Sequence, residues 1–198
     1  DFIDINSIKD RNFKVVIDTV NGANFSILPT ILKKLNCDVV EVFCNNSGVF
    51  DRNPEPIAEN LNILSKKVIE EKADIGFACD PDGDRLSIVD NKGNAIGEEN
   101  TLVLCADSFY EETNSNSPLI TNLSSSMCLD FIASKHNREI FRSAIGEANV
   151  IELMKQKQSD FGGEGNGGVI LKDIHLGRDS LVASIIILNM LQKKNKTL

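Results

Sequence analysis

The feature of this sequence that most restricts its fold is a repeated alternation of short β-branched runs with amphipathic segments. In the first half of the chain, apolar runs bounded by turn residues predict strands at 14–20, 38–43, 73–79 and 86–90. Between the strands, apolar residues recur at helical spacing over 27–35 and from Ile57 to Val68. Strand–helix–strand units join parallel strands through right-handed crossovers, so this half predicts a sheet covered by helices.

The second half repeats the pattern without visible sequence identity to the first. It predicts strands at 119–123 and 139–145 and helices at 99–112, 127–135, 147–157 and 178–193, with Ser124 to Ser126 as helix caps. The segment FGGEGNGGVI, at 161–170, is too rich in glycine to be expected in either kind of element. We therefore predict an α/β fold of two consecutive three-layer α/β units with mixed, mainly parallel sheets, over 1–98 and 99–198.

The amino-acid composition restricts the classes of protein to which this chain can belong. A hydrophobic fraction of 41% can form a real core, and a net charge of −8 argues against nucleic acid or an anionic membrane as partner. The longest apolar run, at 181–191, is too short to span a bilayer and predicts a core helix. Five cysteines without a C-x-x-C pair predict reduced, buried thiols, and together with the lack of an export signal they favour a cytoplasmic location.

The stretch ACDPDGDRLSIVD places aspartates at alternate positions directly after a predicted buried strand. Asp80, Asp82 and Asp84 would repel one another, but Pro81 and Gly83 allow the backbone to curl so that the carboxylates converge. Oxygen ligands in such a turn suit Mg²⁺, which commonly keeps a position for a phosphate oxygen. We call residues 80–85 the aspartate loop and predict a Mg²⁺ site there.

Three other kinds of loop carry aspartates in a similar pattern. A calcium-binding EF-hand would need glycine at the sixth position and glutamate at the twelfth, where this chain has Arg85 and Asn91. A haloacid-dehalogenase-like nucleophile loop would continue into threonine or valine, and Arg85 breaks that pattern. A solvated acidic turn without a ligand is the remaining alternative.

The second candidate site is GGEGNGG at 162–168, which we call the glycine loop. Its glycines permit a close approach of the backbone, while Glu164 and Asn166 offer an acceptor and a mixed donor and acceptor. Such a pair suits the hydroxyl groups of a sugar. The alternative is a glycine-rich hairpin with two exposed polar residues.

Together these motifs resemble the α-D-phosphohexomutase family, which includes phosphomannomutases and phosphoglucomutases. VVIDTVNGANFSILPTILKKLNCDVVEV is similar to the opening of the family's second domain, and ADIGFACDPDGDRLSIVDNKGNAIG is similar to its metal loop. TNLSSSMCLDFIA, AIGEANV and GGEGNGGVI with GRDS are similar to its third domain. The resemblance covers nearly all of the chain in the family's order and implies the two middle domains of such an enzyme.

Members of this family interconvert hexose 1-phosphates and hexose 6-phosphates through a phosphoserine. The resemblance implies that the aspartate loop holds Mg²⁺ against that phosphoserine and that Arg85, as a catalytic residue, lies beside the phosphoryl group in transfer. It further implies that Glu164 and Asn166 bind the hydroxyl groups of the hexose phosphate in either orientation of the substrate.

The chain also departs from the family pattern. The serine loop of the first domain and the phosphate-gripping loop of the fourth have no counterpart in the 198 residues. Some members carry a lysine before the glycine of the AIGEANV segment where this sequence has Ala144, so the general acid and base are unassigned. His136 and His175 lie outside the motifs and are expected to be surface or packing residues.

We therefore expect part of a phosphohexomutase, inactive without the missing first and fourth domains of the same enzyme. The start at Asp1 without methionine favours a fragment, with IDINSIKD as an interdomain connection. A stand-alone module that binds Mg²⁺ and sugar phosphate, half of a split enzyme, and a structural pseudo-enzyme stay open as alternatives. The sequence does not choose among mannose, glucose and glucosamine phosphates, although the glycine loop favours the first two.

Overall fold

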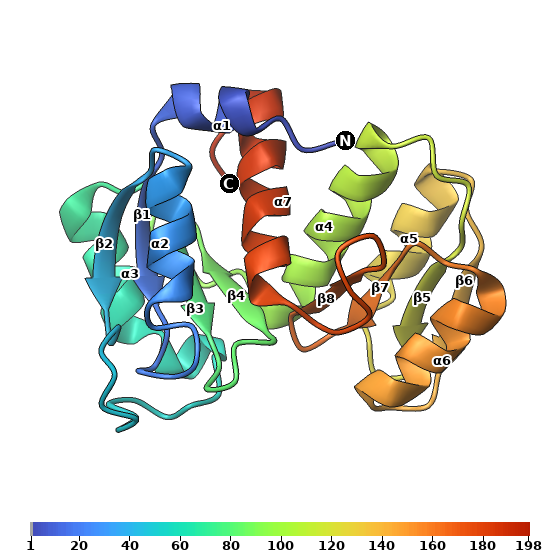
Figure 1. Cartoon of the computed structure of the whole chain (residues 1–198), viewed down its shortest axis with the longest axis horizontal. Coiled ribbons are helices and arrows are strands. Elements are labelled where there is room, and N and C mark those ends of the chain that lie inside the picture. The colour runs from blue at the N-terminus through green and yellow to red at the C-terminus, as the bar shows by residue number, and fades with distance from the viewer. Residues whose placement is uncertain (1) are drawn as a thin grey trace.

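Two four-stranded sheets form the framework of the protein, which a computed structural model describes over residues 2–198 (Figure 1). The first sheet has the order β2-β1-β3-β4, with strands Lys14–Asp18 (β1), Asp38–Val42 (β2), Ile75–Cys79 (β3) and Leu86–Val89 (β4). The second has the order β6-β5-β7-β8, with strands Leu119–Asn122 (β5), Ile140–Ser143 (β6), Phe161–Glu164 (β7) and Gly168–Leu171 (β8). In each sheet three strands run parallel and the last returns antiparallel to its neighbour. The predicted fold class is confirmed.

Helices cover both faces of both sheets. They are Ile5–Arg11 (α1), Ile27–Lys34 (α2), Asn62–Glu71 (α3), Glu98–Glu112 (α4), Cys128–Lys135 (α5), Glu147–Lys157 (α6) and Ser180–Lys194 (α7), with a 3-10 turn at Ala58–Asn60 (η1). Helix α1 was not predicted from the sequence. Only Ile8 of this short helix is buried, so its residues form no apolar stripe at helical spacing. Asp4 gives the overlooked signal, since its side chain caps the helix by accepting from the backbone nitrogen of Ser7 at 3.0 Å.

The strands of the first sheet are apolar on both faces, as expected for parallel strands buried between helices. In β1, Val15 and Ile17 point into one hydrophobic core, while Val16 points into another. The second core contains Leu64 and Val68 of α3. Because alternate residues of a strand face opposite sides, the continuous Val and Ile run of β1 serves both layers.

Helices α4 and α7 contribute to a core that the two units share. One apolar cluster contains Phe77 of the first sheet, Phe161 of the second sheet and Ile187 of α7. Figure 1 shows α7 running between the two sheets. In the second half of α7, Oδ1 of Asn189 accepts a hydrogen bond from the backbone nitrogen of Asp4 at 2.9 Å, which ties α7 to the start of α1. The predicted core helix is confirmed, and among the described residues no helix is long and apolar enough to cross a membrane.

Two predicted elements differ from those observed. The helix expected from Ile57 begins instead at Asn62, because residues 58–60 form the 3-10 turn η1. The segment 161–170 was expected to be too glycine-rich for a strand, but it forms the hairpin of β7 and β8. The reason is close packing: a side chain at Gly163 would collide with the carbonyl of Gly168 on the paired strand.

The expectations for the serines and the cysteine at the start of α5 were also wrong in part. Of the three serines expected as helix caps, only Ser126 reaches the backbone of α5, accepting from Cys128 at 3.2 Å, whereas Ser125 is buried beneath the glycine loop. The thiols were expected to be buried, but Cys128 is exposed on the outer side of α5. Phe131 on the same helix is 70% exposed, so an apolar residue in this segment is not necessarily buried.

The ion pair between Lys14 and Glu71 makes a testable contribution to acid stability. Hydrogen bonds and charges from Lys14 and then Lys67 lower the pKa of Glu71 to about 2, so its stabilising contribution is present above its ordinary value of 4.5 and is lost as the pH falls toward 2. We expect Glu71→Gln to be less stable than wild type at pH 5, with the difference shrinking toward pH 2. Urea unfolding over that range measures it, with Glu70→Gln, a more exposed neighbour, as control. A Glu71→Gln difference that is constant with pH would contradict the prediction.

Candidate functional site

The aspartate loop lies at the edge of the first sheet where the parallel strands end. β3 ends at Cys79, so Asp80 follows the strand directly, and Asp18 is the last residue of the neighbouring strand β1. Open α/β sheets bind ligands at this edge, outside the carboxyl ends of their strands. The predicted metal ligands therefore occupy the edge of the sheet where a ligand is expected.

The three predicted metal ligands converge. One carboxylate oxygen from each of Asp80, Asp82 and Asp84 lies within 4.8 Å of the others. Asp80 is 1% exposed and accepts from the backbone nitrogen of Arg85 at 3.1 Å and from its Nε at 2.5 Å, whereas Asp82 is exposed. Oδ1 of Asp84 is buried, and none of the residues 2–198 donates a hydrogen bond to it.

The negative charges of these carboxylates repel one another. Burial tends to raise the pKa of Asp80, but hydrogen bonds from Arg85 outweigh it and hold that pKa below its ordinary value. Burial and then the charge of Asp80 raise the pKa of Asp84 to about 7. Three converging carboxylates, one of which also has a buried oxygen without a donor, form a hard, electron-rich ligand set. The residues present therefore fit a Mg²⁺ ion.

Hydrogen bonds from neighbouring segments hold the aspartate loop in its conformation. The backbone nitrogen of Ala23, after β1, donates to the carbonyl of Pro81 at 2.7 Å. The side chain of Asn24 donates to the carbonyl of Gly83 at 3.2 Å and to Oγ of Ser180, at the start of α7, at 2.8 Å. Gly83 has a φ of +78°, and a side chain there would collide with Asn24. Residues of both units thus position the aspartate loop.

Arg85, predicted to lie beside a phosphoryl group, is held here by two carboxylates. Its Nε contacts Asp80, and its terminal nitrogens donate to Glu55 at 2.8 and 3.3 Å. The side chain is 19% exposed, so its planar fork is partly accessible at the mouth of the site. Bidentate contact of this fork with another oxyanion would require it to take the place of Glu55, whose side chain is 53% exposed.

A buried ion pair that was not predicted from the sequence lies beneath the aspartate loop. Arg52 donates to Asp18 at 2.8 Å and to the carbonyl of Cys79 at 2.8 Å, and the two charged side chains are 6% and 1% exposed. An aspartate that ends an apolar strand is a detectable signal, because a buried carboxylate needs a partner. The identity of that partner depends on how the loop 46–56 folds back over the sheet.

The glycine loop forms the turn at the end of β7. Glu164 is 4% exposed, and its Oε1 accepts from the side chain of Asn122 at 2.6 Å and from the backbone nitrogen of Gly146 at 2.9 Å. The alternative of a hairpin with two exposed polar residues is therefore right about the hairpin and wrong about the exposure, because Glu164 is buried and Asn166 is half-buried. The carbonyl of Gly167 accepts from the backbone nitrogen of Leu86 at 3.0 Å, which joins the glycine loop to strand β4 of the other unit.

Arg178 connects the two candidate loops and was not predicted as a site residue. It forms an ion pair with Asp84 of the aspartate loop and another with Glu164 of the glycine loop at 2.8 Å. It also lies 3.4 Å from Glu147 and 3.5 Å from Oδ1 of Asn166. Its sequence position, directly before the residue that caps α7, gives a helix signal but cannot reveal contacts across two units.

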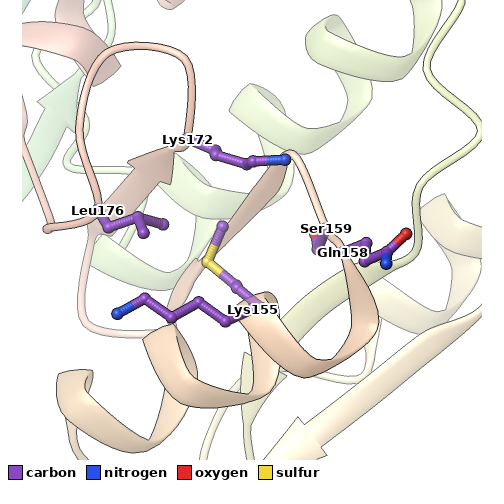
Figure 2. A pocket seen from close by; sticks show the side chains of 6 residues that line it. Lys155, Gln158, Ser159, Lys172 and Leu176 are labelled. Carbon is purple, nitrogen blue, oxygen red and sulfur yellow. The ribbon is translucent and has the colours of Figure 1, made fainter.

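The two histidines lie outside the two loops, although His175 pairs with the residue next to Arg178. His136 contacts Asp107 at 2.7 Å and His175 contacts Asp179 at 3.0 Å, in agreement with the packing and surface roles expected for them. A pocket of about 290 Å³ lies between the end of α6 and the segment after β8. Figure 2 shows its lining, which includes Lys155, Gln158, Ser159, Lys172 and Leu176 and none of the predicted site residues.

Comparison with known protein families gives two matches that together cover almost the whole chain. Residues 1–93 match the family model for phosphoglucomutase/phosphomannomutase, alpha/beta/alpha domain II. Residues 98–198 match the model for alpha/beta/alpha domain III of the same family. The resemblance to the second and third domains, read from the motifs, is confirmed.

Individual relatives agree with these matches. The chain is 37% identical over 195 residues to a phosphoglucomutase/phosphomannomutase of Thermococcus kodakarensis, covering 98% of this chain and 42% of the relative. It is 31% identical to a phosphoglucosamine mutase of Hamiltonella defensa, covering 95% of this chain and 42% of the relative. A solved structure of a phosphoglucomutase/phosphomannomutase family protein from Burkholderia thailandensis is 27% identical, with a TM-score of 0.83 over 96% of this chain and 43% of that one. The chain thus spans less than half the length of the relatives it matches.

Proposed function

This chain belongs to the phosphoglucomutase/phosphomannomutase family, and on that premise we propose that it forms the metal-binding and sugar-binding parts of a phosphohexomutase. The whole enzyme would interconvert hexose 1-phosphates and hexose 6-phosphates. The phosphoserine that carries the phosphoryl group would lie on a domain outside these 198 residues.

The observation that carries this proposal is the meeting of the two loops at one site. Arg178 contacts both Asp84 and Glu164, so the convergent carboxylates and the sugar-loop glutamate lie within the reach of one guanidinium group. A sugar phosphate needs such a pair of neighbouring regions, one for its phosphate and one for its hydroxyl groups. A solvated acidic turn would need no such neighbour.

Each loop would have a distinct role. Asp80, Asp82 and Asp84 would hold Mg²⁺, which when bound supplies positive charge against a phosphoryl group in transfer. Asp80 also orients the fork of Arg85, which would donate hydrogen bonds to phosphate oxygens. Glu164 would accept hydrogen bonds from sugar hydroxyls. Its position is fixed by the donors that hold it at the end of β7.

We propose mannose and glucose phosphates as the substrates. The form of the glycine loop favours them, and the Thermococcus kodakarensis relative, at 37% identity, is named for these two sugars. The Hamiltonella defensa relative, at 31% identity, is named for glucosamine. Comparing the rates of the natural protein with mannose, glucose and glucosamine 1-phosphates tests the choice.

We expect no phosphohexomutase turnover from the 198-residue chain alone, because it has no serine loop to carry the phosphoryl group. A coupled assay with glucose 1-phosphate, on protein freed of host enzymes, measures this. Detectable turnover would contradict the expectation. As positive control, the natural gene product that contains these residues should be active, and its inactivity with all three sugar phosphates would overturn the proposed function.

The mass of the native protein in its source cells decides which form to assay. For an enzyme built of four such domains we expect roughly twice the 21.7 kDa of this chain. Immunoblotting with an antibody against the chain measures that mass. A band at 21.7 kDa would instead support the stand-alone binding module or a split enzyme.

A further inference from the structure

Arg178 lies between the aspartate loop and the glycine loop, and we infer that it couples cation binding at the first loop to ligand binding at the second. The inference rests on the proposed function, because it assigns a positioning role within the same site. Arg178 touches no reacting atom in this role. It acts through Asp84 and Glu164, each of which holds one arm of its guanidinium group.

The contacts of Arg178 are divided between the two loops. Its Nη2 atom pairs with Asp84 and its Nη1 atom donates to Glu164 at 2.8 Å, so each loop holds one arm of the fork. The side chain is 16% exposed, against 18% for Asp84 and 5% for Glu164. In so enclosed a setting the charges are weakly screened, and a change at one arm is felt at the other.

The ion pair between Arg178 and Asp84 also has features that would allow either partner to bind another group. Oδ1 of Asp84 and Nε of Arg178 are both buried without a hydrogen-bond partner among the described residues, so this ion pair leaves hydrogen-bonding capacity unused on each side. Gly168 keeps room for the arginine, since a side chain there would collide with Cδ of Arg178. An arginine with unused donors and a clear approach is suited to exchanging partners.

Cation binding would change the balance between the two partners. A divalent cation on the oxygens of Asp84 competes with the guanidinium for that carboxylate and repels it. Arg178 then interacts mainly with Glu164, Asn166 and the phosphate-bearing sugar at the glycine loop. Because coupling between two sites is reciprocal, strengthening the hold of Glu164 on Arg178 favours the cation, and weakening it disfavours the cation.

Four proteins test this coupling with Mg²⁺ alone as the probe: wild type, Arg178→Met, Glu164→Gln and the double variant. Titration calorimetry on the 198-residue chain should show Arg178→Met binding Mg²⁺ about tenfold more tightly, because a positive charge that repels the divalent cation is removed. Glu164→Gln should weaken Mg²⁺ binding about threefold, within the range of couplings found in one ion-pair network, and this effect should shrink when Arg178 is absent. Lys155→Met, an exposed lysine on α6, is the control for net charge and should leave the affinity unchanged.

The outcomes separate the coupling from the proposed function. Mg²⁺ binding that is equal in wild type and Arg178→Met would overturn the coupling and leave the metal site intact. A merely structural Arg178 would lower the melting temperature without tightening Mg²⁺ binding, which also overturns it. Absence of Mg²⁺ binding in all four proteins would overturn both. If Arg178→Met fails to fold, Glu164→Gln alone decides: weaker Mg²⁺ binding supports the coupling and unchanged binding defeats it.

Discussion

Replacing Asp82 by asparagine is expected to weaken Mg²⁺ binding to this chain by at least about a hundredfold, with little change in thermal stability. Loss of a residue that merely supports a metal ligand commonly costs about 10- to 100-fold in affinity, so loss of a charged ligand should cost at least as much. Stability should be preserved because Asp82 is exposed, and because removing its charge relieves repulsion from Asp80. Titration calorimetry with Mg²⁺ and scanning calorimetry without it measure the two effects.

Two further variants make the Asp82 result specific. Asp173→Asn removes an exposed carboxylate from the turn after β8 and should leave Mg²⁺ affinity unchanged. Asp80→Asn should lose both affinity and stability, because Asp80 is buried and anchors the side chain of Arg85. Wild-type affinity in Asp82→Asn would rule out the aspartate loop as the metal site.

Removing the side chain of Arg52 is expected to destabilise the protein by about 3–5 kcal/mol, the usual cost of leaving a buried charge without its partner. Asp18 is 1% exposed and would lose both the charge and the hydrogen bond of Arg52, while the carbonyl of Cys79 would lose a donor. Urea unfolding of Arg52→Ala measures the loss. Lys33→Ala, which breaks the exposed pair with Glu41, should cost no more than about 1 kcal/mol.

The pH dependence of Arg52→Ala gives a second test with a defined sign. Burial already raises the pKa of Asp18 in the folded protein, and Arg52 opposes that rise. A raised carboxyl pKa means that stability is greatest below the ordinary value of 3.8 and falls as the pH rises through the folded value. The deficit of Arg52→Ala should therefore grow between pH 4 and pH 7. A deficit that is the same at both pH values would show that the charge of Asp18 is not its cause.

Local patterns predicted most of the fold. The Val and Ile runs of β1 and β3 are continuous because these strands are buried on both faces, and the spacing of Leu28 and Leu32 marks the buried side of α2. Those signals lie within a few residues of chain. The hairpin at the glycine loop escaped them because glycine is disfavoured in strands unless a neighbouring backbone approaches closely, and that neighbour cannot be seen locally.

The candidate site likewise has a part that local sequence predicted and a part that it did not. The convergence of Asp80, Asp82 and Asp84 was predictable because alternate positions in one turn determine it. Two arginines of the site were not predictable, because Arg52 reaches Asp18 and Arg178 reaches Asp84 from distant segments. Arg178 lies 94 residues from Asp84, so only the packing of the two units brings the pair together.

The placement of α7 has a consequence for how the chain is made. Among the elements described here, α7 leaves the ribosome last, yet it packs into the core of the first unit and is hydrogen-bonded to Asp4, 185 residues earlier. The N-terminal half therefore cannot finish burying its apolar surface as soon as it is synthesised. Part of its apolar surface must stay exposed until residues 180–194 have been synthesised. The two units therefore do not fold independently of each other during translation.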